Sequence, residues 1–246
     1  MLLVTAALEE ELRIGLALCR EKEKVPHRNL GLWQAKRNDK TIAFLKGGIG
    51  PARSAASLEE ALKIIEPSHI LIIGYAGALD AELRLGDLVA VEKALAFSLD
   101  KNNPTWEDVR LEGTFELMHC ESLAQSAKSV GLNAYTGDVL TSSYVLGNPA
   151  HKKILYDRFH ASIVDMETAA FARIAALKSV PISCIRVVSD EARDTFLAPF
   201  SYDPSTPLAT RVGKLVRKGM VRTFREWKEH SLVANKNLSR FLSHYL

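Results

Sequence analysis

The stretch SIVDMETAAFARIA, residues 162–175, joins an apolar run that begins like a buried strand to a helix-like run from Thr168 to Ala175. Two carboxylates, Asp165 and Glu167, stand where the strand ends and the helix begins. Acids at a helix N-terminus often serve only to suit the helix dipole. An acid that directly follows an apolar run is also partly withdrawn from water, which favours acid–base chemistry.

Apolar strands and helices alternate along the rest of the chain. Expected strands cover 2–7, 69–77, 86–97, 133–142, 162–166 and 181–190, and a hairpin over 32–37 and 41–47 turns at Asn38-Asp39. Expected helices cover 8–19, 47–65 (with Pro51 in its first turn), 115–130, 149–159, 167–178 and the C-terminal tail. This order indicates one α/β domain with a mixed, largely parallel sheet covered on both faces.

The composition is that of a soluble globular protein. The 246 residues are 47% hydrophobic and 25% charged, enough to bury one sizeable core, and no apolar run reaches the roughly 18 residues of a membrane span. The N-terminus lacks the basic start of a signal peptide. Cys19, Cys120 and Cys184 fit neither a disulfide framework nor a zinc spacing, so we expect a cytoplasmic protein without a metal.

The C-terminal segment is strongly basic. Residues 208–246 contain nine Lys/Arg and two Glu, a charge of +7, which leaves −4 for the rest of a chain whose net charge is +3. A helical wheel predicts a basic face opposite an apolar one. A solvated face accounts for this pattern, and weak attraction to an anionic membrane surface is the functional alternative. Nucleic acid is not an expected partner. The basic face comprises Arg211, Lys214, Lys218, Arg222 and Arg225; the apolar one comprises Leu208, Val212, Leu215, Val216, Phe224 and Trp227.

Ligand sites in open α/β sheets lie beyond the carboxyl ends of strands. Four such ends carry notable residues: Glu9–Glu11, Gly74–Ala78, Asp165–Glu167 and Ser189–Asp190. The glycine stretch at 47–50 is neither a P-loop nor a dinucleotide fingerprint.

These ends supply three carboxylate clusters and Arg186, but no Ser–His or Cys–His pair. Such a site suits a reaction with a protonated leaving group, an activated water and a hydroxyl-rich substrate. Cleavage of an N-glycosidic bond, through a transition state that resembles an oxocarbenium ion, is such a reaction.

Seven motifs give the chain a family resemblance: AALEEEL, GGIGPARSAAS, GYAGAL, GDLV, TGDVL, VDMETAA and RVVSDEA. In order and spacing, from residue 2 to about 195, they resemble the bacterial methylthioadenosine/S-adenosylhomocysteine nucleosidases of the purine nucleoside phosphorylase superfamily. VDME followed by SD is the specific part. The resemblance implies an α/β/α sandwich with a central mixed sheet, a homodimer, a purine nucleoside substrate and no cofactor.

The resemblance also implies roles for individual residues. Glu11 would activate the water, Glu167 would accept hydrogen bonds from the ribose 2′- and 3′-hydroxyls, and Asp190, held by Ser189, would protonate purine N7. Met166 would pack under the sugar, and Arg186 would lie near the water and ribose. The backbone of Leu140 and Thr141 would read the purine edge. The remaining expected lining residues are Ala7, Ile49, Tyr75, Ala76, Gly77 and Asp165, the last of which has the weaker claim.

Several positions depart from the family pattern. Tyr75 replaces a small hydroxyl residue and Ala78 replaces a glycine. The phenol would either reshape the sugar or 5′ pocket or rotate away. The C-terminal part also resembles futalosine hydrolase and the hopanoid-associated phosphorylase-like enzymes of adenosylhopane. Together with the apolar segment 196–202 and the basic amphipathic helix that follows it, Tyr75 predicts a 5′ group larger or more apolar than methylthio.

Two alternatives to a nucleosidase remain. A phosphorylase of the same fold is one: Glu11 would repel phosphate, but Arg53 offers a cation. A non-catalytic nucleoside-binding or membrane-surface module is the other, and the carboxylate set argues against it. We expect residues 1–205 to form the catalytic domain and 206–246 a helical segment of the same domain.

Overall fold

The computed structural model of the chain describes residues 1–98, 109–195 and 221–246, and in the last helix the side chains from His230 onward. The strands are β1 (Leu2–Ala6), β2 (Arg20–Lys24), β3 (Gly31–Arg37), β4 (Lys40–Lys46), β5 (His69–Ile72), β6 (Tyr75–Ala78), β7 (Leu88–Ser98), β8 (Arg110–Glu116), β9 (Ala134–Thr141), β10 (Ile163–Asp165) and β11 (Ile182–Asp190). The helices are α1 (Glu9–Ala17), α2 (Pro51–Ala61), α3 (Cys120–Ser129), α4 (Pro149–Phe159), α5 (Thr168–Leu177) and α7 (Val221–Tyr245).

All strands belong to one mixed sheet in the order β2-β3-β4-β1-β5-β11-β6-β10-β9-β7-β8, and β7 also pairs with β11. Strands β11, β6, β10, β9 and β7 therefore close into a ring. The length of β7 makes this possible: residues 88–90 pair with β11, while residues 93–98 pair with β8. The predicted mixed sheet is confirmed, but half of it curls instead of lying open.

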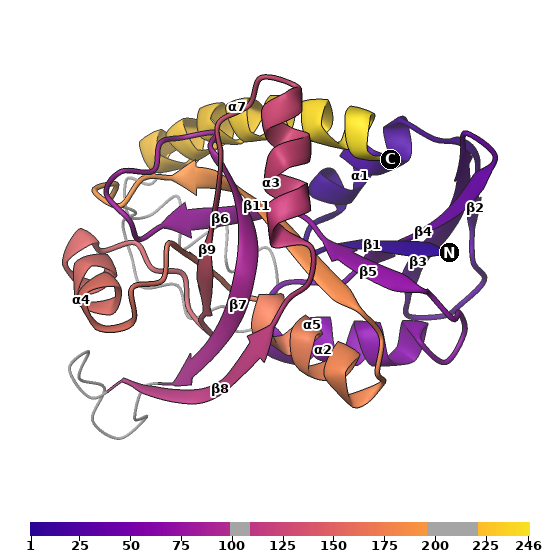
Figure 1. The fold of residues 1–246 in the computed structure, drawn as a ribbon, viewed down its shortest axis with the longest axis horizontal. Coiled ribbons are helices and arrows are strands. Elements are labelled where there is room, and N and C mark those ends of the chain that lie inside the picture. Colours follow the sequence, from indigo (N-terminus) through magenta and orange to yellow (C-terminus); the bar gives the residue numbers. More distant parts are fainter. Residues whose placement is uncertain (99–108, 196–220) are drawn as a thin grey trace.

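Helices cover both faces of the sheet, which confirms the α/β/α sandwich (Figure 1). Helices α1, α3 and α7 lie over one face, and α2 and α5 lie over the other. Each layer has its own apolar core, centred on Leu58 and Phe171 beneath α2 and α5, and on Leu12, Leu123 and Phe241 beneath α1, α3 and α7.

Two local predictions that rest on turn and helix-start residues are confirmed. Helix α2 begins at Pro51, and the β3–β4 hairpin turns at Asn38 and Asp39, which both have positive φ angles as a type I′ turn requires.

Two predicted elements differ from the structure in their extent, and one exposed strand was not predicted. The expected strand 69–77 is two strands that break at Ile73 and Gly74, the latter with φ +134°. The expected helix 115–130 begins only at Cys120, because residues 110–116 form the edge strand β8. Strand β2 was missed, since its five residues are all exposed and show no apolar alternation.

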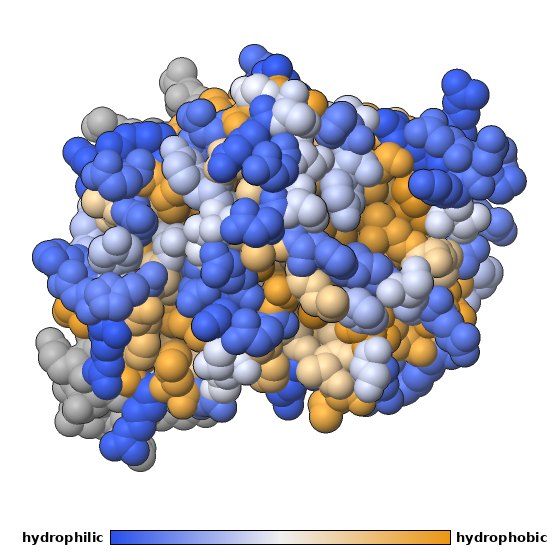
Figure 2. Space-filling view, viewed as in Figure 1, coloured by the Kyte–Doolittle hydropathy of each residue, from blue (hydrophilic) through white to orange (hydrophobic). Residues whose placement is uncertain are grey.

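Apolar side chains also reach the surface. Figure 2 shows hydrophobic areas between hydrophilic groups on one face of the molecule. Leu177 and Leu232 are the most exposed large apolar residues, at 72% and 63%. Scattered exposure of this kind is normal in a folded protein. Within the described residues, none of the helices combines the length and apolar character that crossing a bilayer requires.

Helix α7 joins the core on the α1 and α3 side through four buried residues: Ala234, Leu238, Phe241 and Leu242. The predicted basic face at 211–225, with its apolar counterpart and the segment 196–202, lies outside the residues and side chains that the structure describes. The domain boundary at 205 and the membrane contact therefore stay predictions.

Replacement of Phe241 by Ala should show that α7 folds as one unit with the sheet. The ring is fully buried, so its loss should lower the free energy of unfolding by about 3–5 kcal/mol in denaturant titrations. Leu232→Ala in the same helix removes an exposed side chain and should change stability by less than about 0.5 kcal/mol. Equal stability of the two variants would mean that α7 is not part of the cooperative core.

Candidate active site

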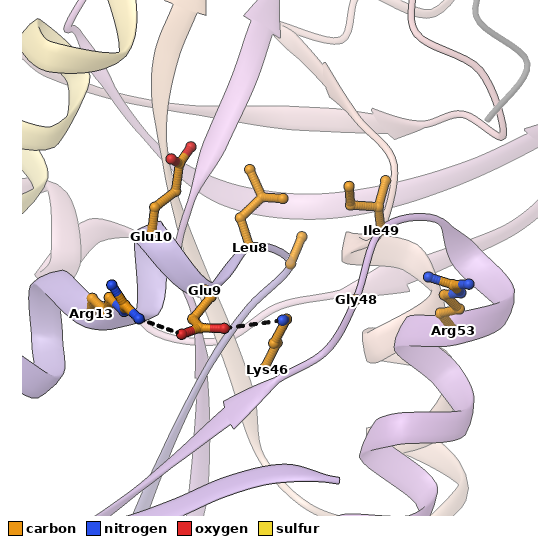
Figure 3. Close-up of a pocket in the computed structure, with 9 residues that line it drawn as sticks. Leu8, Glu9, Glu10, Arg13, Lys46, Gly48, Ile49 and Arg53 are labelled. Carbon is orange, nitrogen blue, oxygen red and sulfur yellow. Dashed lines mark hydrogen bonds and ion pairs between the residues drawn. The ribbon is translucent and has the colours of Figure 1, made fainter. Parts of the chain in front are cut away.

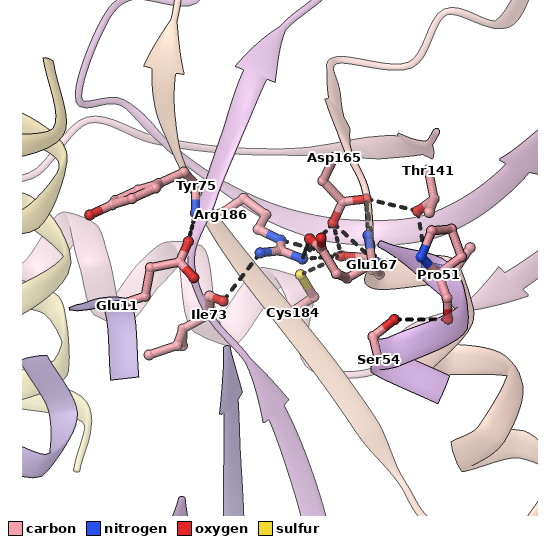
Figure 4. Close-up of polar contacts among 12 residues, drawn as sticks. Glu11, Pro51, Ser54, Ile73, Tyr75, Thr141, Asp165, Glu167, Cys184 and Arg186 are labelled. Atoms are coloured by element: carbon pink, nitrogen blue, oxygen red, sulfur yellow. Dashed lines mark hydrogen bonds and ion pairs between the residues drawn. The ribbon is translucent and has the colours of Figure 1, made fainter. Parts of the chain in front are cut away.

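Most of the predicted site residues converge where β1, β4, β6, β10 and β11 end and α1, α2 and α5 begin. The close-up in Figure 4 shows the carboxylates of Glu11, Asp165 and Glu167 on either side of the Arg186 guanidinium. Glu11 comes from α1, Asp165 from the end of β10, and Arg186 from β11. Segments more than 150 residues apart in the chain thus meet at one edge of the sheet.

Glu11 is buried and held by two backbone groups. Its Oε2 accepts a hydrogen bond from Leu8 N–H (2.7 Å), as in one half of a capping box, and its Oε1 accepts one from Tyr75 N–H (2.9 Å). Burial raises the pKa of the Glu11 carboxyl, against the opposing effect of Arg186 and of these two N–H groups. Glu11 therefore caps α1 and also places its own carboxyl group, with a raised pKa, in the site.

Arg186 is the fully buried cation of the site. Its Nη2 donates to Asp165 Oδ2 at 2.5 Å and lies 3.8 Å from Glu167 Oε2, and its Nη1 donates to the carbonyl of Ile73 at 3.2 Å. Gly74 allows this cation and Glu11 to approach each other. A Cβ at position 74 would lie 2.6 Å from Glu11 Oε1 and 2.7 Å from Arg186 Nη1, and the φ of +134° also requires glycine.

Asp165 is occupied by protein groups. Beside Arg186, it accepts hydrogen bonds from Thr141 Oγ1 (2.8 Å), from Thr168 N–H (3.1 Å) and from the Thr168 hydroxyl. It therefore anchors Arg186 and the start of α5. Its expected contact with a substrate stays a prediction.

Glu167 is the acid with a free oxygen. Its Oε1 accepts a hydrogen bond from Gly50 N–H at 2.9 Å, at the start of α2, while among the described residues Oε2 has only the distant Arg186 contact. Burial, together with the charge of Asp165, raises the pKa of Glu167 to about 8. The adjacent Met166 is half-buried, at the surface of the site.

Asp190 lies at the end of β11 with two partners of different kinds. Its Oδ1 accepts the Ser189 hydroxyl at 2.9 Å, and its Oδ2 accepts the ammonium of Lys152 at 2.5 Å. Oδ2 also lies against the bare backbone of Gly77, where a Cβ would come within 2.7 Å. The Ser189 contact agrees with the expectation. Lys152 was missed, because nothing in its sequence neighbourhood separates it from the exposed Lys153.

A cavity of about 80 Å³ lies beside Asp190. It is lined by Gly77, Tyr144, Val145, Leu146, Val164, Asp165 and Asp190. Residues 144–146 were not predicted, although their position just after the carboxyl end of the strand 133–142 was a usable signal.

The backbone of Leu140 and Thr141 lies inside the sheet. Strand β9 is paired with β10 on one side and with β7 on the other at both residues, and the Thr141 hydroxyl donates to Asp165. Their expected role in reading the purine edge stays a prediction. The first backbone beyond the sheet is that of residues 142–146.

A larger cleft of about 580 Å³ opens on the other side of the site (Figure 3). Its lining consists of Ala7, Leu8, Glu9, Glu10, Arg13, Lys46, Gly48, Ile49 and Arg53. Glu9 pairs with Arg13 (2.7 Å) and with Lys46 (3.2 Å). Ala7 and Ile49 were predicted site residues, and Glu9, Glu10 and Arg53 were noted in the sequence, but Arg13 and Lys46 were not.

The ring of Tyr75 points away from the carboxylate cluster around Arg186. Its phenol donates to Asn235 Oδ1 of α7 at 2.5 Å and packs with the core on that side; Figure 4 shows it pointing away from Arg186. Only its backbone N–H, which binds Glu11, belongs to the site. Of the two outcomes considered for the phenol, rotation away is the one observed, because α7 supplies a partner from a distant part of the chain. The next residue, Ala76, is buried beside Gly77 in β6.

The described residues contain no group of three or more His, Cys, Asp and Glu side chains that could hold a metal ion. The three cysteines are free.

Glu167 should make the stability of the protein depend on pH. Its folded pKa of about 8 exceeds the ordinary value of 4.5, so its stabilising effect is complete below about pH 4.5 and is lost as the pH rises towards 8. Each unit of pKa difference is worth about 1.4 kcal/mol. Glu167→Gln should therefore reduce the fall in unfolding free energy between about pH 5 and pH 8. Glu11 contributes in the same direction, so part of the fall should remain.

Denaturant titrations at the two pH values make this comparison. Glu121→Gln, which changes an exposed glutamate of α3, should behave as the wild type does. A slope in Glu167→Gln that equals the wild-type slope would contradict the raised pKa.

Comparison with known proteins finds a relative that is similar over most of the chain. A 5′-methylthioadenosine/S-adenosylhomocysteine nucleosidase of Glaesserella parasuis is 28% identical over 228 residues, which cover 90% of this chain and 98% of that protein.

Solved structures share the fold at lower identity. The nucleosidase of the same name from Neisseria meningitidis, in complex with methylthio-immucillin-A, has a TM-score of 0.75 at 18% identity and covers 99% of this chain and 96% of its own. Futalosine hydrolase of Helicobacter pylori has a TM-score of 0.71 at 20% identity, with coverages of 98% and 96%. The model of the Phosphorylase superfamily matches residues 2–245, and the chain belongs to that family.

Proposed function

We propose that this protein hydrolyses the N-glycosidic bond of a purine nucleoside, and that the substrate is a 5′-modified adenosine. The observation that carries the proposal is the cluster of Glu11 and Glu167 around Arg186, with Asp190 at the neighbouring strand end. The names of the similar proteins, methylthioadenosine/S-adenosylhomocysteine nucleosidase and futalosine hydrolase, support a nucleoside substrate.

Glu11 has the properties of the base that activates water. Its carboxyl has a raised pKa, and two backbone N–H groups hold it in one orientation. In the proposed reaction it takes a proton from water while the water oxygen bonds to C1′ of the sugar. General base catalysis of this kind typically contributes about 10²–10⁴-fold.

Glu167 is suited to the ribose hydroxyls. Gly50 N–H fixes one of its oxygens, and the other can accept a hydrogen bond from a diol. Holding the sugar in this way keeps C1′ close to its reacting geometry. The half-buried Met166 next to it offers an apolar surface to the sugar.

The composition of this cluster favours hydrolysis over phosphorolysis. Three buried carboxyl groups surround a single guanidinium, and Asp165 already neutralises that cation, so the center attracts a phosphate nucleophile only weakly. The carboxyl oxygens stabilise a sugar that becomes cationic in the transition state. Phosphorolysis remains the alternative because Lys46 and Arg53 line the cleft beside Ile49.

Asp190 faces the small cavity, where the purine would leave. As the C1′–N9 bond breaks, its electron pair passes to the purine, and a proton from Asp190 at N7 lets the base depart neutral. The cavity wall formed by residues 144–146 and Gly77 offers backbone and apolar surface for the ring.

The 5′ group would extend past Ile49 into the larger cleft. The sequence favoured a large apolar group, whereas the described lining includes Arg13, Lys46 and Arg53 with two glutamates. We therefore favour a 5′ substituent with polar or charged ends over a purely apolar one. The homodimer implied by the family resemblance and the cytoplasmic location inferred from the cysteine pattern are part of the same proposal.

The experiment that tests the function is a substrate panel with and without phosphate. We expect release of adenine from methylthioadenosine, S-adenosylhomocysteine or a longer 5′-thioadenosine without added phosphate, with free sugar as the second product. Futalosine and inosine extend the panel to other 5′ groups and bases. Base release that occurs only with phosphate and yields a sugar phosphate would identify a phosphorylase, and no release at all would favour a binding module.

Glu11→Gln should separate catalysis from binding. The amide keeps the shape of the side chain but cannot take a proton, so kcat should fall by about 10²–10⁴-fold, while nucleoside binding by calorimetry persists. Glu59→Gln is the matched control, since Glu59 is an exposed glutamate of α2 and lines neither of the two cavities described above, and it should retain wild-type turnover. The proposed role fails if Glu11→Gln keeps wild-type turnover.

A further inference from the structure

Lys152 is a buried cation that the roles above do not use. Its side chain in α4 is fully buried, although it belongs to the residue type that is most rarely buried. Its Nζ donates to Asp190 Oδ2 at 2.5 Å and to the carbonyl of Glu191 at 2.8 Å. A buried ammonium is tolerated only when it is paired, so the start of α4 is built around the end of β11.

The surroundings of Asp190 make Lys152 its single cationic hydrogen-bond partner among the described residues. Asp165, at the end of β10, lines the same cavity but is bound to Arg186. Tyr144, which follows β9 in the chain, lines the cavity and carries a neutral phenol. From β11, Ser189 donates a hydroxyl. The Glu191 side chain instead accepts the N–H of Leu85. Strand β6 presents Gly77, which has no side chain.

We propose that Lys152 is a positioning residue that strengthens Asp190 as the acid for the leaving base, an assignment that rests on the proposed function. When the Asp190 carboxylic acid gives its proton to purine N7, the carboxylate left behind lies 2.5 Å from an ammonium. That charge pairing favours the transfer. The same pairing disfavours the protonated carboxyl at high pH, so Lys152 also sets the upper pH limit of turnover.

Removal of the Lys152 charge should lower the maximal kcat but raise the pH at which turnover is lost. Lys152→Gln keeps a hydrogen-bond donor but removes the ammonium, and Lys152→Met removes both. In both variants the plateau of kcat at low pH should fall. The fall should reach up to about a hundredfold in Lys152→Met, because there the Asp190 carboxylate also loses its hydrogen-bond donor. The alkaline limb of the profile of kcat against pH should move to higher pH by about one unit or more. Lys152→Arg keeps the charge and should keep the wild-type limb.

Lys153→Met is the matched control. Lys153 is the next residue of α4, but it is exposed and pairs with Asp157 on the helix surface. The same substitution there should leave both the plateau and the limb unchanged. If the Lys152 variants lose activity equally at every pH, with no movement of the limb, Lys152 has only a structural role and the proposal is wrong.

A second measurement does not depend on turnover. Infrared spectra of protein with isotope-labelled aspartate, compared with Asp190→Asn, follow the band of the protonated Asp190 carboxyl. This band should persist to higher pH in Lys152→Gln than in the wild type, and loss of the band at the same pH in both proteins would overturn the proposal. Since the substrate panel alone decides whether the wild type releases base, failure of the proposed function and failure of this inference are distinguishable.

Discussion

The burial of the Arg186 guanidinium is the constraint on which the rest of the site depends. A charge that is withdrawn from water requires anions and hydrogen-bond acceptors close by, and here they come from the end of β10, from the start of α5 and from the carbonyl of Ile73. Asp165 meets this requirement most directly, and in doing so it also fixes the first turn of α5. The strand–helix junction at 162–175 is thus held together by an ion pair with β11.

The site has two electrostatically different halves. In one half, Glu11, Glu167 and Asp165 surround the single cation of Arg186, and burial is the main reason that the pKa of both glutamates is raised. In the other half, Asp190 and Lys152 form a pair of opposite charges. In the proposed function, the first half faces a sugar that becomes cationic and the second half faces a base that takes up a proton.

The curled half of the sheet explains how the two halves come together. Strand β11 pairs first with β5 and then with β6, and the break at Ile73 and Gly74 allows this change of direction. The glycine also leaves room for Glu11 and Arg186 to approach each other. On the opposite side of β6, Tyr75 connects the same strand to α7 through Asn235. A residue that departs from the family pattern thus serves packing against the last helix.

The sequence by itself determined the alternation of strands and helices, the mixed sheet, and the strand ends where Glu11, Glu167 and Asp190 stand, because periodicity and chain order are local properties. Tertiary structure decided which oxygens stay free. Asp165 pairs with Arg186, and the phenol of Tyr75 donates to Asn235. Lys152, and not its exposed neighbour Lys153, is buried and pairs with Asp190. These outcomes depend on partners between 21 and 160 residues away, and a pattern read over a few turns contains no information about which distant group will satisfy a buried charge.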